Sequence, residues 1–118
     1  MTKNSGRACA AAAVALAIGG CSGDDALDGK SIVLVHGAWS GAWAWSDVKA
    51  GLEARGAAVT AVELPGHGDD MTTIASISLR AYVNTVEAAI DAAHKPVMLV
   101  GHSMGGVVVI EVVDERAA

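Results

Sequence analysis

Cysteine and aromatic residues are scarce in this 118-residue sequence. Its two cysteines, Cys9 and Cys21, are too few for a disulfide framework, and no Cys/His spacing suits a zinc site. Aromatic residues make up 3% of the chain and phenylalanine is absent, so a core has to be built from small and β-branched side chains. No motif implies a metal or any other cofactor.

Basic residues are also few. Eight Lys/Arg against 13 Asp/Glu give a formal net charge of -5, and no basic stripe is visible, which argues against a nucleic-acid partner. Hydrophobic residues make up 53% and charged residues 18%, which is the composition of a folded chain rather than a disordered one. The length allows one small domain.

The apolar run at residues 8–18 is too short to span a bilayer, and it follows Lys3 and Arg7 as in a signal peptide. Small residues then lead into Cys21 as IGGC, which resembles a bacterial lipobox, where the cysteine carries lipid and becomes the first mature residue. Residues 1–20 are thus predicted to be a lipoprotein-type signal peptide and residues 21–29 a polar tether. This predicts anchoring in the bacterial cell envelope through Cys21; an ordinary leader of a secreted or periplasmic protein, or an uncleaved anchor, is the alternative.

The remainder alternates between apolar runs and helical patterns. The short apolar run at residues 31–36 predicts a strand buried on both faces, as in a parallel sheet, and residues 57–64 and 97–100 predict the second and third strands. Residues 45–55 and 78–94 predict helices, the second with Ser78 as its N-cap. This order indicates an α/β fold with a three-stranded parallel sheet and crossover helices.

The last segment, VVVIEVVDERAA, presents a conflict between propensity and motif. Valine and isoleucine are poor helix formers, so propensity alone favours a strand over residues 107–113. A strand continuing directly from residues 97–100 would leave Ser103 with no turn. We therefore expect a helix after Ser103.

Ser103 lies in the pattern G-x-S-x-G, between Gly101-His102 and Met104-Gly105. A serine hydroxyl is a weak nucleophile that needs an adjacent base and N–H donors for the oxyanion that forms. A sharp strand-to-helix turn lifts such a hydroxyl above the sheet, and glycines on both sides prevent side-chain clashes. The pattern alone is suggestive; its place after an apolar strand adds weight, since ligands of open α/β sheets gather at strand carboxyl ends.

Three motifs together resemble the α/β-hydrolase fold: VLVHGAWSGAWAW, VTAVELPGHG and VMLVGHSMGG, within residues 30–108. They are most similar to the branch of methyl esterases and hydroxynitrile lyases. The resemblance implies that residues 30–118 are the N-terminal part of such a domain and that Ser103 is the nucleophile. It implies the N–H groups of Ala38 and Met104 as oxyanion donors and a small-molecule ester as substrate. Glu63 stands where relatives often have Asp.

The family's other catalytic residues are expected after the nucleophile, an acid first and then a histidine. No histidine follows His102, and the acids after Ser103 lie on the expected last helix. We therefore expect a fold truncated after that helix and a chain that is inactive although derived from a carboxylic-ester hydrolase. A non-catalytic surface lipoprotein, a binding module or a degenerate relic is the alternative, and esterase and lyase chemistry are not distinguished.

Several further residues are expected to have structural rather than catalytic roles. His36 is expected to be structural, and His67 to be a turn residue. The tryptophans Trp39, Trp43 and Trp45 fit either an acyl pocket or packing beneath the crossover. Asp69 and Asp70 are expected to be solvated loop charges.

Overall fold

The computed structural model describes residues 26–118 of the chain. The predicted signal peptide and Cys21 lie outside the described residues, as does most of the predicted tether. Its last residues, 26–29, form a turn that leads into the first strand. Within the described part, no helix is both long and apolar enough to cross a membrane.

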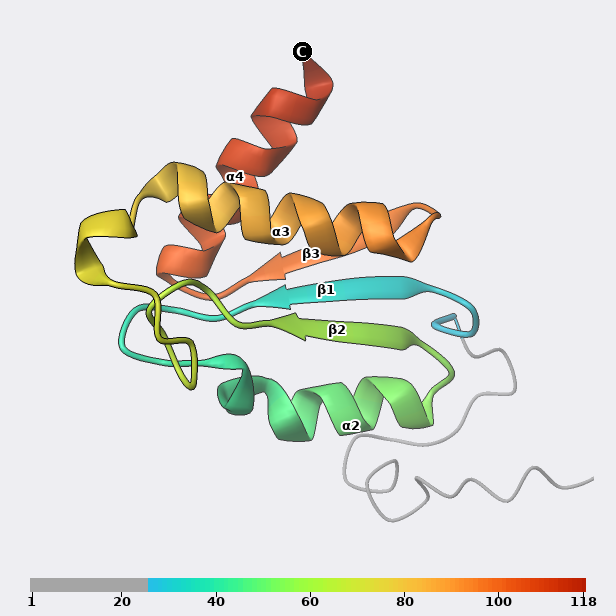
Figure 1. Cartoon of the computed structure of the whole chain (residues 1–118). Helices are drawn as coiled ribbons and strands as arrows, with labels where there is room; N and C mark the ends of the chain where they lie inside the picture. Colours follow the sequence, from blue (N-terminus) through green and yellow to red (C-terminus); the bar gives the residue numbers. More distant parts are fainter. Residues whose placement is uncertain (1–25) are drawn as a thin grey trace, which may run out of the picture.

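Three strands form one parallel sheet in the order β2-β1-β3 (Figure 1). The predicted sheet with crossover helices is thus confirmed. The elements follow one another along the chain as β1 (Ser31–Val35), the 3-10 turn η1 (Ala42–Trp45), α2 (Ser46–Ala54), β2 (Ala58–Val62), the 3-10 turn η2 (Ile74–Ser76), α3 (Leu79–Ala93), β3 (Val97–Gly101) and α4 (Met104–Ala117).

The strands end flush at one edge. Val35, the last residue of β1, is paired with Val62 at the end of β2 and with Gly101 at the end of β3. The loops that leave these three ends therefore start side by side, although they are far apart in the sequence.

Helices cover the sheet on both faces, with α3 and α4 on one side and α2 on the other (Figure 1). Alternate residues of β1 serve the two sides because successive strand side chains point to opposite faces. Val33 and Val35 join the core beneath α3 and α4, whereas Ile32 and Leu34 join the core beside α2. Each of these four side chains is at most 3% exposed.

The predicted helix over residues 78–94 is α3. The Ser78 hydroxyl accepts a hydrogen bond from the Ala81 N–H at 3.0 Å, as an N-cap should. His94 ends the helix in the left-handed conformation. The predictions at 31–36, 45–55 and 57–64 exceed the observed elements by one to three residues, because their patterns continue into the adjoining turns, whereas β3 extends one residue beyond the predicted 97–100.

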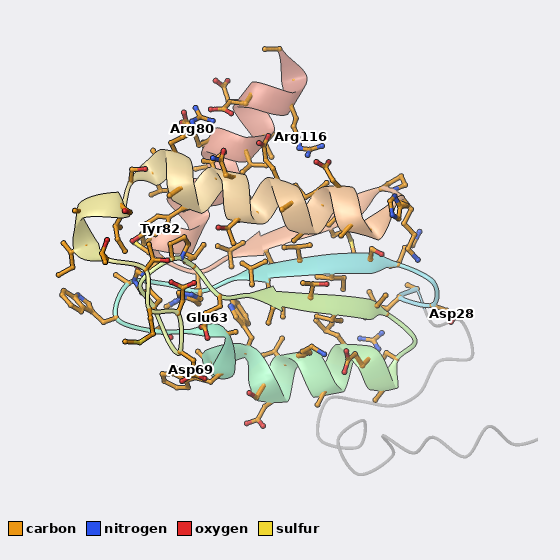
Figure 2. All side chains as sticks on the ribbon, in the orientation of Figure 1. Asp28, Glu63, Asp69, Arg80, Tyr82 and Arg116 are labelled. Carbon is orange, nitrogen blue, oxygen red and sulfur yellow. The ribbon has the colours of Figure 1, made fainter. Side chains whose placement is uncertain are left out.

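The expected last helix is confirmed as α4, which overrides the strand propensity of its valines. Val108 and Val112 are four residues apart and fully buried against the core of α3 and β1. Arg80 of α3 binds both carboxylate oxygens of Glu115, and Arg116 bonds Asp91 at 2.6 Å (Figure 2). Burial of one stripe and ion pairs across the helices hold a segment that has little intrinsic helix preference.

Candidate functional site

Ser103 lies at the bend between β3 and α4. Its backbone has φ 53° and ψ -120°, a conformation that L-residues rarely adopt. Such strain costs on the order of 1–3 kcal/mol and persists only where the surrounding structure imposes it, most often at functional sites. The residue is exposed, so the bend presents its hydroxyl at the sheet edge.

The glycines on either side of Ser103 are required by close backbone contacts. A Cβ on Gly101 would lie 2.5 Å from the carbonyl oxygen of Gly105. A Cβ on Gly105 would lie 2.3 Å from the carbonyl oxygen of Val35. The G-x-S-x-G spacing therefore lets the first turn of α4 pass against both β3 and the end of β1, as predicted for a sharp turn.

The loop after β1 lies against the same bend. The N–H of His102 donates to the carbonyl oxygen of Val35 at 3.0 Å. A Cβ on Gly37 would lie 3.2 Å from the Cβ of Ser103, so Gly37 allows the two segments to touch. The residue after Gly37 is Ala38, one of the two expected oxyanion donors.

Ala38 and Met104 line one hollow of about 460 Å³. Among residues 26–118, neither N–H group has a hydrogen-bond acceptor. Two amides that have no acceptor and line one hollow beside the Ser103 bend can bind an oxygen that develops negative charge. The hollow is completed by loop residues and by one α3 side chain: Trp39, Ser40, Gly66, His67, Gly68 and Tyr82.

His36 is structural in the described residues, as expected. It is 1% exposed, and its Nε2 accepts the N–H of Leu64 at 3.1 Å. An accepting Nε2 carries no hydrogen, so Nδ1 does, and it donates to the carbonyl oxygen of Gly37 at 2.8 Å. Both ring nitrogens are engaged, and His36 has none left for the Ser103 hydroxyl.

His67 lies in a turn, where its N–H donates to the carbonyl oxygen of Leu64 at 3.0 Å. Its ring lies between those of His36 and Tyr82, with centroid distances of 5.1 and 5.7 Å. The prediction of a turn residue is confirmed, and His67 also lines the hollow.

The carboxylates near the hollow organise loops. Asp70 accepts N–H groups from Gly66 and Thr72, each at 2.8 Å, and these bonds lower the pKa of Asp70. Glu63 accepts N–H groups from Ala42 and Asp69. Asp69 itself is exposed, as expected, but Asp70 does more than stay solvated because it closes a turn.

The Ser103 hydroxyl has no hydrogen-bond partner within residues 26–118. No set of three or more His, Cys, Asp or Glu residues in that range is placed to hold a metal ion.

The three tryptophans behave differently. Trp45 packs against the core beside α2, whereas Trp39 is 98% exposed and Trp43 is 68% exposed. The packing interpretation is therefore right for Trp45 and wrong for the other two, since Trp39 lies in the loop after β1 and Trp43 in η1, both outside the core. Trp39 lines the hollow, as the pocket interpretation expects.

Sequence reasoning missed the role of Glu63. Its partner Ala42 is 21 residues away, in a loop whose path no sequence pattern specifies. The sequence holds an indirect signal, since glycines at positions 41 and 68 leave room for a side chain between two loops.

Parallel strands, crossover helices and a G-x-S-x-G bend at a strand carboxyl end define the α/β-hydrolase class of fold. The chain belongs to the alpha/beta hydrolase family, whose model matches residues 32–118.

Similar proteins point to one branch of that family. Methylesterase 7 of Arabidopsis thaliana is 44% identical over 82 residues, which cover 66% of this chain and 32% of the relative. Salicylic acid-binding protein 2 of Nicotiana tabacum is 42% identical over 82 residues, covering 67% and 32%. The chain thus spans about a third of the length of these relatives.

Solved structures agree with the sequence comparisons. An extracellular alpha/beta-hydrolase from a Paenibacillus species, described as structurally and functionally homologous to the tobacco protein, superposes with a TM-score of 0.65 at 30% identity. That match covers 73% of this chain and 35% of the other. A polyneuridine aldehyde esterase mutant gives a TM-score of 0.63 at 36% identity, covering 68% and 32%.

Proposed function

We propose that Ser103 is the nucleophile for carboxylic-ester hydrolysis, with a small-molecule ester as substrate. The Ser103 oxygen attacks the ester carbonyl and passes its proton to a base, and the carbonyl oxygen becomes an oxyanion. The N–H groups of Ala38 and Met104 bind that oxyanion. The alcohol then leaves with a proton, and water hydrolyses the acyl-serine to release the acid and restore the hydroxyl.

One observation carries this proposal: a strained, exposed serine lies at the bend that begins α4, and the N–H groups of Met104 and Ala38 have no acceptor of their own in the described residues. Strain at a single non-glycine residue is a feature that folds retain where geometry serves function. The esterase relatives agree with this chemistry.

The base is the missing part of the mechanism in residues 26–118. His36 is committed to Leu64 and Gly37, and no other group bonds the Ser103 hydroxyl. We therefore propose that this segment alone acylates slowly, since removing the base of a serine hydrolase leaves only residual catalysis. The same observation favours the second candidate, a non-catalytic binding module that uses the hollow at Ala38 for a carbonyl ligand.

Chemical rescue separates the two candidates. The folded chain is treated with a fluorophosphonate, with and without free imidazole, and modified serines are identified by peptide mass spectrometry. A nucleophile beside a formed oxyanion site reacts at Ser103, and faster as imidazole supplies the base. Ser103→Ala is the control and should take up no label. A folded chain that stays unmodified at Ser103 even in imidazole contradicts the hydrolase proposal and favours the binding module.

We also propose that the chain is attached to the bacterial cell envelope by lipid on Cys21, which the IGGC motif supports. Growth with an alkyne fatty acid should label the chain but not the Cys21→Ser variant. Equal labelling of both, or release of unlabelled chain into the medium, would contradict the anchor.

A further inference from the structure

We infer that Glu63 is a positioning residue that fixes the loop carrying the Ala38 donor, an inference that rests on the proposed function of Ser103. Glu63 follows directly after β2, and the loop in question follows β1. The two segments leave neighbouring strands at the same edge of the sheet.

The carboxylate of Glu63 joins two loops. Its Oε1 accepts the N–H of Ala42 at 2.7 Å, and its Oε2 accepts the N–H of Asp69 at 3.2 Å. Figure 2 labels Glu63 and Asp69, which lie beside the start of α2. Ala42 begins a 3-10 turn, so its N–H has no acceptor within that turn, and the carboxylate supplies one.

The surroundings of Glu63 leave space for this side chain and little else. A Cβ on Gly41 would lie 2.7 Å from Oε1, and a Cβ on Gly68 would lie 2.2 Å from the same atom. The backbones of both loops therefore approach the carboxylate closely. These close contacts fix the orientation of the carboxylate, and the carboxylate in turn fixes the position of both loops.

The next residue, Leu64, holds the other end of the same segment. Its N–H donates to Nε2 of buried His36, and Nδ1 of that ring donates to the carbonyl oxygen of Gly37. Residues 63 and 64 thus hold the loop after β1 at two points, one at His36 and Gly37 and one at Ala42. Ala38 lies between these points.

Displacement of an oxyanion donor has a large effect on rate, because donors act at distances of about 2.7–3.1 Å from the developing charge. Glu63→Gln keeps the size of the side chain but replaces one accepting oxygen with an NH2 group, which would face an N–H donor. Releasing either loop would let the Ala38 N–H move, and a misplacement of about 1 Å can cost on the order of 100-fold in rate.

The test compares Glu63→Gln with Glu53→Gln, the same change at an exposed residue of α2 that pairs with Lys49. Acylation of Ser103 is measured with an activated ester in imidazole, and the rate constant at saturation is separated from the half-saturation concentration. We expect Glu63→Gln to lower the rate constant about 10-fold or more at little change in half-saturation, as for a lost transition-state contact. Glu53→Gln should leave both unchanged.

Hydrogen exchange provides a readout that needs no turnover. Residues 37–42 should exchange faster in Glu63→Gln than in the unaltered chain, and at the unaltered rate in Glu53→Gln. Unaltered exchange over residues 37–42, or an unaltered rate constant in a reactive chain, overturns the role of Glu63. A Ser103 that never reacts overturns the proposed function, and hydrogen exchange over residues 37–42 then tests by itself whether Glu63 holds the loop.

Discussion

Strands β1 and β3 are both five residues long, mostly apolar and paired to each other, but their surroundings differ. Every residue of β1 is buried, whereas no residue of β3 is. Met98 and Val100 of β3 are paired with Ile32 and Leu34 of β1, yet they are 43% and 41% exposed. In the described part of the chain, α2 packs beside β1 and β2 on that face and leaves β3 open.

The comparison shows that an apolar run determines a strand but not its share of the core. β1 gains burial because it has a partner strand on each side and helices on both faces. β3 has one partner strand among residues 26–118, and its inward side chains, Val97 and Leu99, are only partly buried. Stability should therefore depend strongly on contacts with β1 and weakly on those with β3.

The largest test of this contrast uses two adjacent glycines of α4. Gly105→Ala places a Cβ 2.3 Å from the Val35 carbonyl oxygen at the end of β1, so backbone must move. We expect a loss of about 3 kcal/mol in the free energy of unfolding. Gly106→Ala meets nothing nearer than the Gly101 carbonyl oxygen at 3.8 Å, at the end of β3.

That second substitution serves as the control, because alanine in place of a helical glycine should stabilise by roughly 0.5–1 kcal/mol. Urea unfolding followed by circular dichroism measures both variants. Similar stabilities for the two variants would mean that the backbones of α4 and β1 can move apart with no loss in the free energy of unfolding.

A valine pair tests the strands themselves. Val35→Ala empties a fully buried position in β1 and should cost about 2–3 kcal/mol, from lost burial and the cavity left behind. Val100→Ala makes the same change at an exposed position in β3 and should cost less than about 1 kcal/mol. Equal losses in urea unfolding would show that β3 is as well covered as β1.

The smallest effect concerns the ion pair that ties α4 to α3. The hydrogen bond from Arg80 lowers the pKa of Glu115, so the folded state favours the charged carboxylate. The stability that this ion pair contributes is complete above pH 4.5, the ordinary pKa of a glutamate. It is lost as the pH falls through the lowered pKa of Glu115 in the folded state.

Because Arg80 is exposed and Glu115 is only partly buried, the effect is a shallow fall in the unfolding midpoint on acidification. Glu115→Gln should show less of that fall than the unaltered chain. Identical acid profiles for both would remove Glu115 from any role in holding α4.

The order of elements was predictable because strong local patterns agreed with the motif. The apolar run at 31–36 favours a buried strand, and the apolar stripe that follows the Ser78 N-cap favours a helix, so each segment has one structure that fits its pattern. The last helix needed the motif as well, because valines at 107–109 favour a strand and only the bend at Ser103 argues otherwise. Intrinsic helix propensity and the motif disagreed over this segment, and tertiary packing favours the helix.

The rest of the candidate site was not predictable, because it depends on where loops meet. Whether Trp39 is buried depends on the path of the loop after β1, and the partners of Glu63 come from two separate loops. The exposure of β3 depends on its place at the edge of the sheet, which a run of apolar letters does not specify. These are relations between distant segments rather than properties of any one of them.

Because the three strands end at the same level, the register between them determines how the candidate site residues are spaced. One residue inserted in β1 would advance Ala38 by about 3.3 Å relative to Ser103, and it would exchange the faces on which the β1 valines lie. A turn added at the C-terminal end of α2 or α3, far from the strand carboxyl ends, would leave the spacing of Ala38 and Ser103 unchanged, since those helices return the chain to the opposite edge. A change in the length of a crossover helix is thus tolerated, whereas a change in the length of a strand is damaging. The strand lengths therefore set the distance between the Ala38 N–H and the Ser103 hydroxyl.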